Sequence, residues 1–389
     1  MVKTGLDVIR ESPERLKRYG TLGLLYNQAS ISSGMILAPE VINSIAPGRL
    51  KVLFGPQHGV GLTEQDNMIE TSHQIHEKFQ LPVYSLYESS RRPSKEMLKD
   101  VDAALIDIQD VGTRVYTFAT TALYLMNACA DSGKPVIVLD RPNPVNGLDV
   151  QGNVLDPAYT SFVGPYPIPM RHGMTIGELM GYYNGKYELG CDLDVVRMEC
   201  WERGQYFDET GLVWAMPSPN MPTVETAIVY PGQVLLEGTR LSEGRGTTRP
   251  FEIFGAPYFE PERILGNLDT DCLDGAFMRE INFRPAFNKF ANQTCKGFQL
   301  HVTNRDKFRP YSASLAIIAS IAMTHTDDFG LFEGPYEYVF DKRPIDVIAG
   351  DKTIVDAILS GRRVLELEES WNDGLRQFMQ DREEFLLYG

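Results

Sequence analysis

The stretch AALIDIQDVGTRVYTFATTALYLMNACADSGKPVIVLD, residues 103–140, decides the fold. Two nearly continuous apolar runs, Ala103–Ile108 and Pro135–Asp140, flank a longer segment, Thr117–Asp131, with helical periodicity and a glycine cap at Gly133. Continuous apolar runs are typical of strands that are buried on both faces. The stretch therefore predicts a strand–helix–strand unit of a parallel sheet.

The same alternation extends toward the N-terminus. Apolar runs predict further strands at Thr21–Tyr26, Leu50–Phe54 and Pro82–Tyr87, and the segments between them predict helices at Ala38–Ile45 and Lys95–Lys99. Alternating strands and helices form a doubly wound parallel sheet, which binds ligands at the carboxyl ends of its strands. We therefore predict an α/β fold with this sheet in residues 1–160.

Beyond residue 140 the pattern changes. A proline-rich stretch up to Pro169 predicts a crossing between domains. The remaining segments are expected to be the helices Thr175–Tyr187, Thr223–Tyr230 and Ser312–Met323 and the strands Leu193–Cys200 and Gly297–Val302. Because they do not alternate regularly, residues 161–389 are expected to form an α+β C-terminal domain.

The charge balance limits the possible partners. The chain has 37 Lys and Arg against 52 Asp and Glu, a net charge of −15, which argues against binding to nucleic acid or to an anionic membrane. No apolar run approaches the roughly 18 residues of a membrane span, and the N-terminus has no signal-peptide core. We expect a soluble cytoplasmic protein, or a periplasmic or secreted one if a signal peptide precedes this chain.

The sequence predicts neither a cofactor nor a metal. The first strand is not followed by G-x-G-x-x-G, and Ser242–Arg249 lacks the lysine of a phosphate-binding loop. The five cysteines include no C-x-x-C pair and are expected to be reduced thiols. His73 and His76 have no third ligand at zinc-site spacing, so solvated histidines are the favoured interpretation.

Three polar clusters follow predicted strands, where such folds place ligands. The candidate functional residues in them are Gln57 and His58 of Gly55–Gly59, Asp110, Arg114 and Tyr116 of the segment that begins at Asp107, and Asp140, Arg141 and Asn143 of Leu139–Pro144. Each cluster also has a purely structural interpretation. The first could be a turn with a hydrogen-bonded histidine, the second could contain a buried structural acid at Asp107, and the third could be a salt-bridged domain corner.

A fourth cluster gathers most of the candidate cationic groups. Its segments are 169–173, 217–225 and 237–249, and its candidates are Arg171, His172, Asn220, Glu225, Glu237, Arg240, Glu243, Arg245 and Arg249. Guanidinium groups bind carboxylates and phosphates through paired hydrogen bonds, so this cluster could bind an anionic ligand; it could equally be a solvated ion-pair network. Trp201, Trp214 and Trp371 could line a sugar site or pack in the core.

These motifs, together with Pro82–Tyr87 and Pro335–Tyr338, resemble in this order the DUF1343 family, represented by exo-β-N-acetylmuramidases of the NamZ type. The resemblance covers nearly the whole chain. It implies a Rossmann-like domain joined to a smaller C-terminal domain, with the active site in the cleft between them. It also implies removal of terminal N-acetylmuramic acid from peptidoglycan fragments during cell-wall turnover and recycling, with a saccharide or muropeptide as the partner molecule.

One position departs from the family pattern. The family usually has a glutamate, its favoured catalytic acid, where this chain has Gln57, and a carboxamide neither holds nor releases a proton near neutral pH. Asp110 and Glu243 are the replacements best placed by motif, and Glu64 and Glu70 are the nearest in sequence. The alternatives are a muropeptide-binding protein without catalysis and a hydrolase of another bond that uses His58 with Asp110.

The arginines of the fourth cluster have an expected role in this interpretation. N-acetylmuramic acid carries a lactyl carboxylate, and we expect at least one of Arg171, Arg240, Arg245 and Arg249 to bind it. Asn220, Glu225 and His172, with the polar residues of the second and third clusters, are expected to complete the substrate site.

Overall fold

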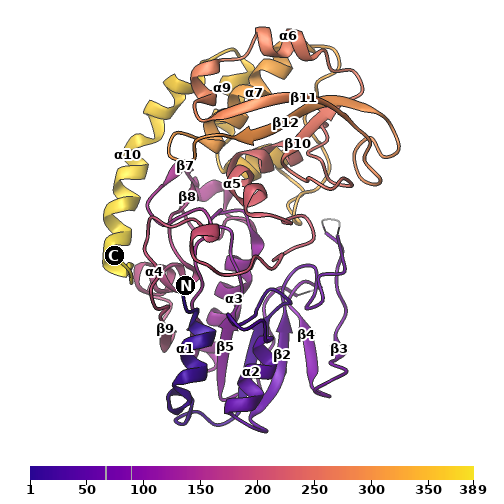
Figure 1. Ribbon diagram of the computed structural model, residues 1–389. Helices are drawn as coiled ribbons and strands as arrows, with labels where there is room; N and C mark the ends of the chain where they lie inside the picture. The colour runs from indigo at the N-terminus through magenta and orange to yellow at the C-terminus, as the bar shows by residue number, and fades with distance from the viewer. Residues whose placement is uncertain (66–67, 89) are drawn as a thin grey trace.

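A seven-stranded sheet forms the centre of the N-terminal part of the computed structural model, which describes residues 1–65, 68–88 and 90–389 (Figure 1). The order of the strands is β3-β4-β2-β1-β5-β6-β9. Their bounds are β1 Leu22–Tyr26, β2 Leu50–Gly55, β3 Gln74–Ile75, β4 Pro82–Ser85, β5 Ala103–Asp107, β6 Val136–Leu139 and β9 Leu193–Val196.

All neighbouring strands are parallel except β3, which runs antiparallel to β4. The central strand β1 is buried along its whole length, and its Leu24 pairs with Leu53 of β2 and with Leu105 of β5. The chain therefore winds outward in both directions from β1 and β5. The prediction of a doubly wound parallel sheet is confirmed.

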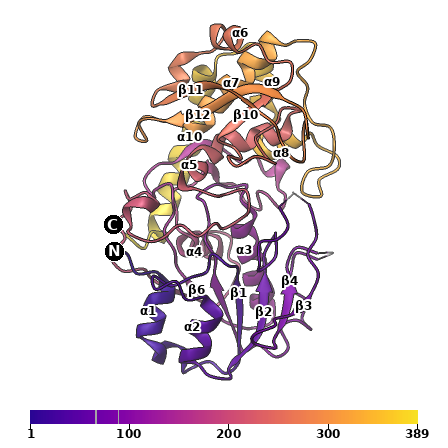
Figure 2. The ribbon, with the colours of Figure 1, turned by 45° about the vertical axis from the view of Figure 1, so that its right-hand side comes forward.

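Helices cover both faces of this sheet (Figure 2). On one face, α1 (Gly5–Glu11) and α2 (Ala38–Ile45) pack over Leu22 and Leu24. On the other face, α3 (Thr117–Asp131) and α4 (Ile176–Lys186) contact each other. The carboxyl ends of β2 and β5 lead into the loops that carry the first two polar clusters.

Two expectations differ from the structure. Lys95–Lys99 forms turns with i to i+3 hydrogen bonds, such as Leu98 N to Lys95 O at 3.2 Å, because so short a segment does not offset the cost of helix nucleation. The predicted strand Leu193–Cys200 ends at Val196 and pairs with β6. The sheet therefore extends past the boundary expected at residue 160.

The C-terminal part mixes an antiparallel sheet with helices, in agreement with the α+β expectation. Its strands, in the order β10-β12-β11, are β10 Ile253–Ala256, β11 Ala276–Phe283 and β12 Cys295–Val302. Its helices are α5 Val224–Gln233, α6 Pro261–Gly266, α7 Pro310–Thr324, α8 Pro344–Ala349 and α9 Lys352–Leu359. The hairpin β7 (Gln151–Val154) and β8 (Pro169–Arg171) lies between the two parts (Figure 1).

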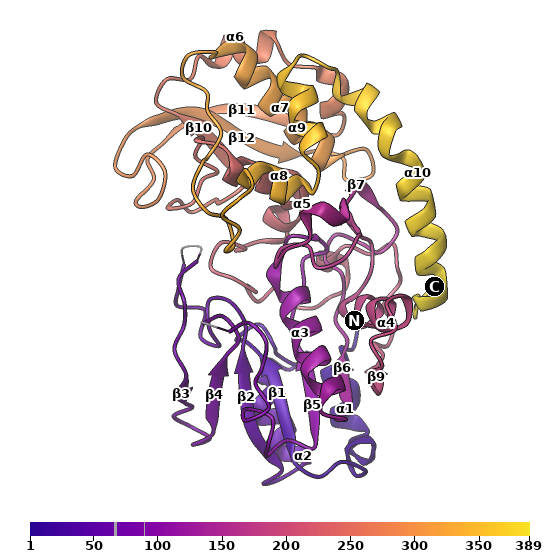
Figure 3. The same ribbon diagram turned by 180° about the vertical axis from the view of Figure 1, so that it is seen from behind.

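Two segments connect the C-terminal part back to the N-terminal part (Figure 3). Helix α10 (Val364–Arg382) runs along one side toward α4, where Asp381 pairs with Lys186 at 2.8 Å. The loop of residues 325–343, between α7 and α8, descends toward the sheet. None of the helices in the described part of the chain is long and apolar enough to cross a membrane.

Candidate active site

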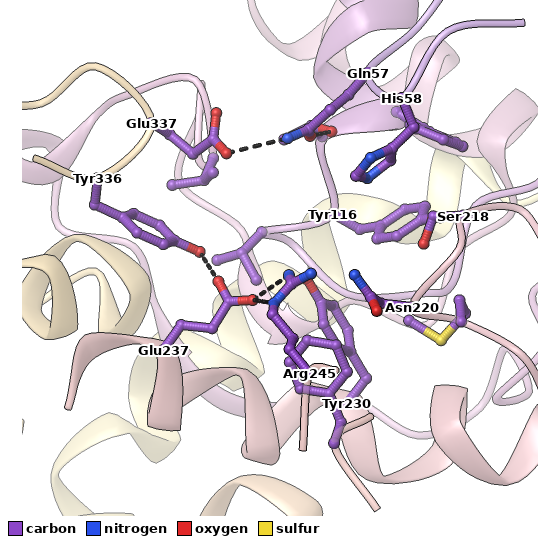
Figure 4. A pocket seen from close by; sticks show the side chains of 16 residues that line it. Gln57, His58, Tyr116, Ser218, Asn220, Tyr230, Glu237, Arg245, Tyr336 and Glu337 are labelled. Carbon is purple, nitrogen blue, oxygen red and sulfur yellow. Dashed lines mark hydrogen bonds and ion pairs between the residues drawn. The ribbon is translucent and has the colours of Figure 1, made fainter. Parts of the chain in front are cut away.

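A small pocket lies where the two parts meet (Figure 4). The lining comes from the Gly55–Gly59 turn, the start of α3, residue 163, the loop before α5, α5 with the segment that follows it up to residue 251, and the 325–343 loop. Its residues are Gln57, His58, Val115, Tyr116, Thr117, Phe118, Val163, Ser218, Asn220, Met221, Tyr230, Glu237, Arg245, Phe251, Tyr336 and Glu337.

Gln57 joins the two sides of the pocket. Its Oε1 accepts a hydrogen bond from the Thr117 hydroxyl at 2.6 Å, and its Nε2 donates to Glu337 Oε1 at 3.2 Å. The hydroxyl and the carboxyl together orient the amide, with its nitrogen toward Glu337. Gln57 is thus a donor to a carboxyl group at the position where the family pattern has an acid.

Glu337 is a buried carboxyl group with polar partners. It is only 4% exposed, and its other oxygen, Oε2, accepts a hydrogen bond from the Tyr87 hydroxyl at 2.7 Å. Burial raises the pKa of Glu337, and the bonds from Tyr87 and Gln57 offset part of this rise. The backbone has φ of 44° at Glu337 and 68° at Tyr338, a left-handed conformation that costs non-glycine residues about 1–3 kcal/mol each.

Glu237, the second carboxyl group in the pocket, has the opposite environment. It forms an ion pair with Arg245 and accepts the Tyr336 hydroxyl at 2.7 Å (Figure 4). Burial alone would raise its pKa, but the charge of Arg245 and these hydrogen bonds hold the pKa of Glu237 below its usual value. One pocket therefore holds one carboxyl group whose pKa is raised and one whose pKa is lowered, the arrangement expected of an acid with a charged partner.

An aromatic wall and a histidine complete the pocket. Tyr230 packs edge-on against Tyr116, with ring centres 5.9 Å apart, and against Phe251, at 4.8 Å. Aromatic faces of this kind offer apolar surface to a ligand. His58 has φ of 69° and its Nδ1 lies 2.6 Å from the Glu64 carbonyl oxygen, so Nδ1 carries a proton.

The structure brings some of the sequence-predicted site residues together and not others. Those that line the pocket are Gln57, His58, Tyr116, Asn220, Glu237 and Arg245. The remaining ones lie elsewhere, and their positions fall into three groups.

Three predicted residues are buried without lining the pocket. Asp110 accepts a hydrogen bond from the Gly112 amide at 2.7 Å and lies 3.4 Å from His172 Nε2. Glu243 pairs with Lys289 at 2.8 Å and with Arg245 Nε at 3.4 Å. In this conformation Asp110 does not line the pocket. Glu243 contacts the pocket residue Arg245 and does not line the pocket itself.

Five further candidates are held by structural contacts. Arg114 donates to four backbone carbonyls, Arg141 pairs with Asp107, and Arg171 pairs with Asp149 at 3.0 Å. Asp140 accepts the hydroxyls of Thr175 at 2.7 Å and Tyr388 at 2.6 Å, and burial raises its pKa to about 6. Asn143 donates to the Met174 carbonyl at 3.0 Å.

The remaining candidates lie at the surface. Glu225, Arg240 and Arg249 have side chains that are 60%, 59% and 47% exposed, and Arg240 and Arg249 pair with Glu333 and Glu252. The four arginines therefore do not converge. Arg245 is the cationic side chain of the pocket within the described residues, which corrects the expectation of an arginine cluster.

The other residues singled out by the sequence also lie outside this pocket. Glu64 and Glu70 line an adjoining hollow with Gly55 and Gly59. In the described ranges, no three His, Cys, Asp or Glu side chains are grouped so that they could hold a metal ion. Three tryptophans pack edge-on against aromatic rings rather than lining the pocket, namely Trp201 on Tyr388, Trp214 on Phe207 and Trp371 on Tyr311.

The sequence reasoning gave no role to two pocket residues of the 325–343 loop, Tyr336 and Glu337. They belong to Pro335–Tyr338, which contributes to the family resemblance but does not follow a predicted strand. A glutamate between two tyrosines was the available signal. The role of Glu337 depends on its hydrogen bond with Gln57, which lies 280 positions away in the chain. No local sequence pattern predicts a contact over that distance.

Comparison with known proteins identifies the family. Residues 22–225 match the family described as "Exo-beta-N-acetylmuramidase NamZ, N-terminal", and residues 228–388 match its C-terminal counterpart. The chain belongs to the NamZ family. The resemblance drawn from the motifs is confirmed, and the two NamZ regions meet between residues 225 and 228.

Characterised and solved relatives of the NamZ family agree with this assignment. The peptidoglycan beta-N-acetylmuramidase NamZ of Bacillus subtilis (strain 168) is 41% identical over 387 residues, which cover 100% of this chain and 91% of the relative. Two crystal structures of DUF1343 family proteins from Bacteroides fragilis NCTC 9343 cover 100% of this chain and 99% of their own. Their TM-scores are 0.87 and 0.78, at 31% and 26% identity.

Proposed function

We propose that this protein is a glycoside hydrolase that removes terminal N-acetylmuramic acid from peptidoglycan-derived saccharides, in cell-wall turnover and recycling. The observation that carries the proposal is the pocket between the two NamZ regions, because it holds two carboxyl groups whose pKa values are shifted in opposite directions. Glycoside hydrolysis needs a proton donor and a second group that stabilises or attacks the anomeric carbon.

The remaining lining residues fit a sugar acid. Tyr116, Tyr230 and Phe251 provide apolar surface for the ring, while Asn220 and His58 provide polar atoms nearby. Arg245, although paired with Glu237, is the group available for a lactyl carboxylate, since Arg171, Arg240 and Arg249 are held elsewhere. We propose that Arg245 and the Glu237 carboxylate together orient the muramic acid ring.

Gln57 favours one competing function, a muropeptide-binding protein that has lost its acid. Turnover of 4-nitrophenyl N-acetyl-β-muramide decides between the two functions. Release of nitrophenolate with many turnovers per protein supports the hydrolase. Binding of N-acetylmuramic acid without turnover, measured by calorimetry, would support the binding protein instead.

Substrate choice gives a first prediction. We expect kcat/KM to be at least about 100-fold higher for the N-acetylmuramide than for the matching N-acetylglucosaminide, because the second substrate leaves the polar groups near Arg245 without their carboxylate partner. Initial rates with the two nitrophenyl glycosides measure this ratio. Equal rates would contradict a site built for the lactyl group.

Chelation gives a second prediction. The described residues offer no group of three metal-ligating side chains, so we expect kcat to be unchanged after dialysis against EDTA. The assay compares dialysed enzyme with enzyme supplied with Mg²⁺, Ca²⁺ or Zn²⁺. Activity that is lost in EDTA and restored by one of these ions would refute metal independence.

A further inference from the structure

We propose that Glu337 is the proton donor of this protein and that Gln57 is the positioning residue that orients it. This inference rests on the proposed function and names the group that replaces the missing acid at position 57. It goes beyond the family pattern because the acid comes from the opposite side of the pocket, on the 325–343 loop, rather than from the Gly55–Gly59 turn.

The hydrogen bonds around the two residues support this assignment. Gln57 already uses its amide nitrogen to donate to Glu337 and its oxygen to accept from Thr117. A protonated glutamate at position 57 would make the same two bonds, so glutamine copies the shape and polarity of that acid without its transferable proton. The carboxyl at the other end of the 3.2 Å hydrogen bond can carry one.

The position of Glu337 is set from both parts of the protein. Its backbone belongs to the loop before α8, while Tyr87, which follows β4, and Gln57, which follows β2, hold its two oxygens. The left-handed φ of 44° at Glu337 shows that this loop bends sharply to direct the carboxyl into the pocket (Figure 4). Such strain at a pocket residue is typical of functional sites.

The charged and titratable groups around Glu337 include Tyr87, Tyr230, Glu237, Arg91 and, as chain neighbours, Tyr336 and Tyr338. Burial raises the pKa of Glu337, and the nearby charge of Glu237 adds to this rise. The Tyr87 and Gln57 hydrogen bonds and the charge of Arg91 lower the pKa in part. The carboxyl therefore keeps its proton to higher pH than an exposed glutamate, as a general acid requires.

The proposed step balances as a hydrolysis. The bond between the anomeric carbon and the glycosidic oxygen breaks, and its electron pair goes to the oxygen, which takes the proton from Glu337. The Glu237 carboxylate stabilises the positive charge that develops on the sugar ring. Water then supplies a hydroxyl to the anomeric carbon and the proton that restores the carboxyl of Glu337.

The test compares leaving groups. A good leaving group needs little protonation, so Glu337→Gln should lower kcat/KM by about 10² or more on an N-acetylmuramyl disaccharide but much less on the 4-nitrophenyl glycoside. Glu333→Gln, an exposed carboxyl of the same loop, is the matched control and should leave both rates unchanged. Equal losses on the two substrates, or an unchanged disaccharide rate, would overturn the assignment.

An exchange of the two side chains tests the same assignment with the carboxyl on the opposite side of the pocket. The double variant Gln57→Glu with Glu337→Gln keeps the hydrogen bond but moves the carboxyl to the other side, so it should recover at least about tenfold over Glu337→Gln on the disaccharide. If Glu337→Gln does not fold, it gives no reference rate, and Tyr87→Phe decides. Tyr87→Phe removes a donor and should move the alkaline limb of the pH–kcat/KM profile upward.

The failures of the two proposals can be told apart. If the unmodified protein cleaves no N-acetylmuramide, the proposed function fails and this inference fails with it. The other outcome is that the unmodified protein cleaves the disaccharide, the exchange variant recovers no activity and Tyr87→Phe leaves the alkaline limb in place. In that case Glu337 is not the donor, while the proposed function stands.

Discussion

Replacing Glu237 with glutamine is expected to lower kcat/KM for an N-acetylmuramide by about 10³, near the upper end of what one preorganised electrostatic group contributes. Glu237 is the ionised carboxyl of the pocket, held by Arg245 and the Tyr336 hydroxyl. A neutral amide in its place removes the negative charge that faces the developing positive charge on the sugar. Steady-state rates on the disaccharide and the nitrophenyl glycoside should fall together, since this role does not depend on the leaving group.

The loss of the ion pair must be separated from the loss of activity. Glu237→Gln removes one carboxylate partner of Arg245, which also pairs with Glu243 at 3.4 Å, and should cost about 3 kcal/mol or more in the free energy of unfolding. Adding Arg245→Met removes the buried charge while Glu243 keeps Lys289 at 2.8 Å. The double variant should regain stability, but it also lacks the proposed partner of the lactyl carboxylate. The role of Glu237 is therefore judged from the rate per folded molecule of Glu237→Gln itself, and a rate equal to that of the unmodified protein would show that Glu237 acts only on the fold.

Arg114→Met is expected to lower the free energy of unfolding by about 4 kcal/mol or more, because several buried carbonyls lose their donor at once. Arg114 is buried, and its guanidinium donates to the carbonyls of Asn153 at 3.0 Å, Ile168 at 2.9 Å, Ile348 at 3.0 Å and Ala349 at 2.8 Å. The last two end α8, so the positive charge also lies at a helix C-terminus, where it is favourable.

Urea unfolding followed by tryptophan fluorescence measures this change, with the exposed Arg279→Met as the matched control, expected within about 0.5 kcal/mol of the unmodified protein. Because α8 follows the loop that carries Glu337, Arg114→Met should also lower activity in the folded protein. A loss of stability below about 1 kcal/mol would mean that water or a neighbouring group replaces the guanidinium.

The sequence predicted the sheet more reliably than it predicted which polar side chains lie in the pocket. Arg114, Asp140 and Arg141 all follow strands, where ligands bind, yet each is held by contacts within the protein. A motif shows which chemistry a side chain offers but not whether a neighbouring backbone or carboxylate already uses it. The same limit applies to the arginines of the fourth cluster, of which Arg245 alone reaches the pocket among the described residues.

The sequence by itself determined the doubly wound sheet, because burial on both faces requires continuous apolar runs such as Ala103–Asp107 and these can be read locally. It also determined that Gln57 and His58 lie at a strand end and that no acid stands at position 57. Only the tertiary structure decided that Glu337 meets Gln57, since that contact depends on how a loop far along the chain packs against the sheet. Burial in that contact, rather than residue type, raises the pKa of Glu337.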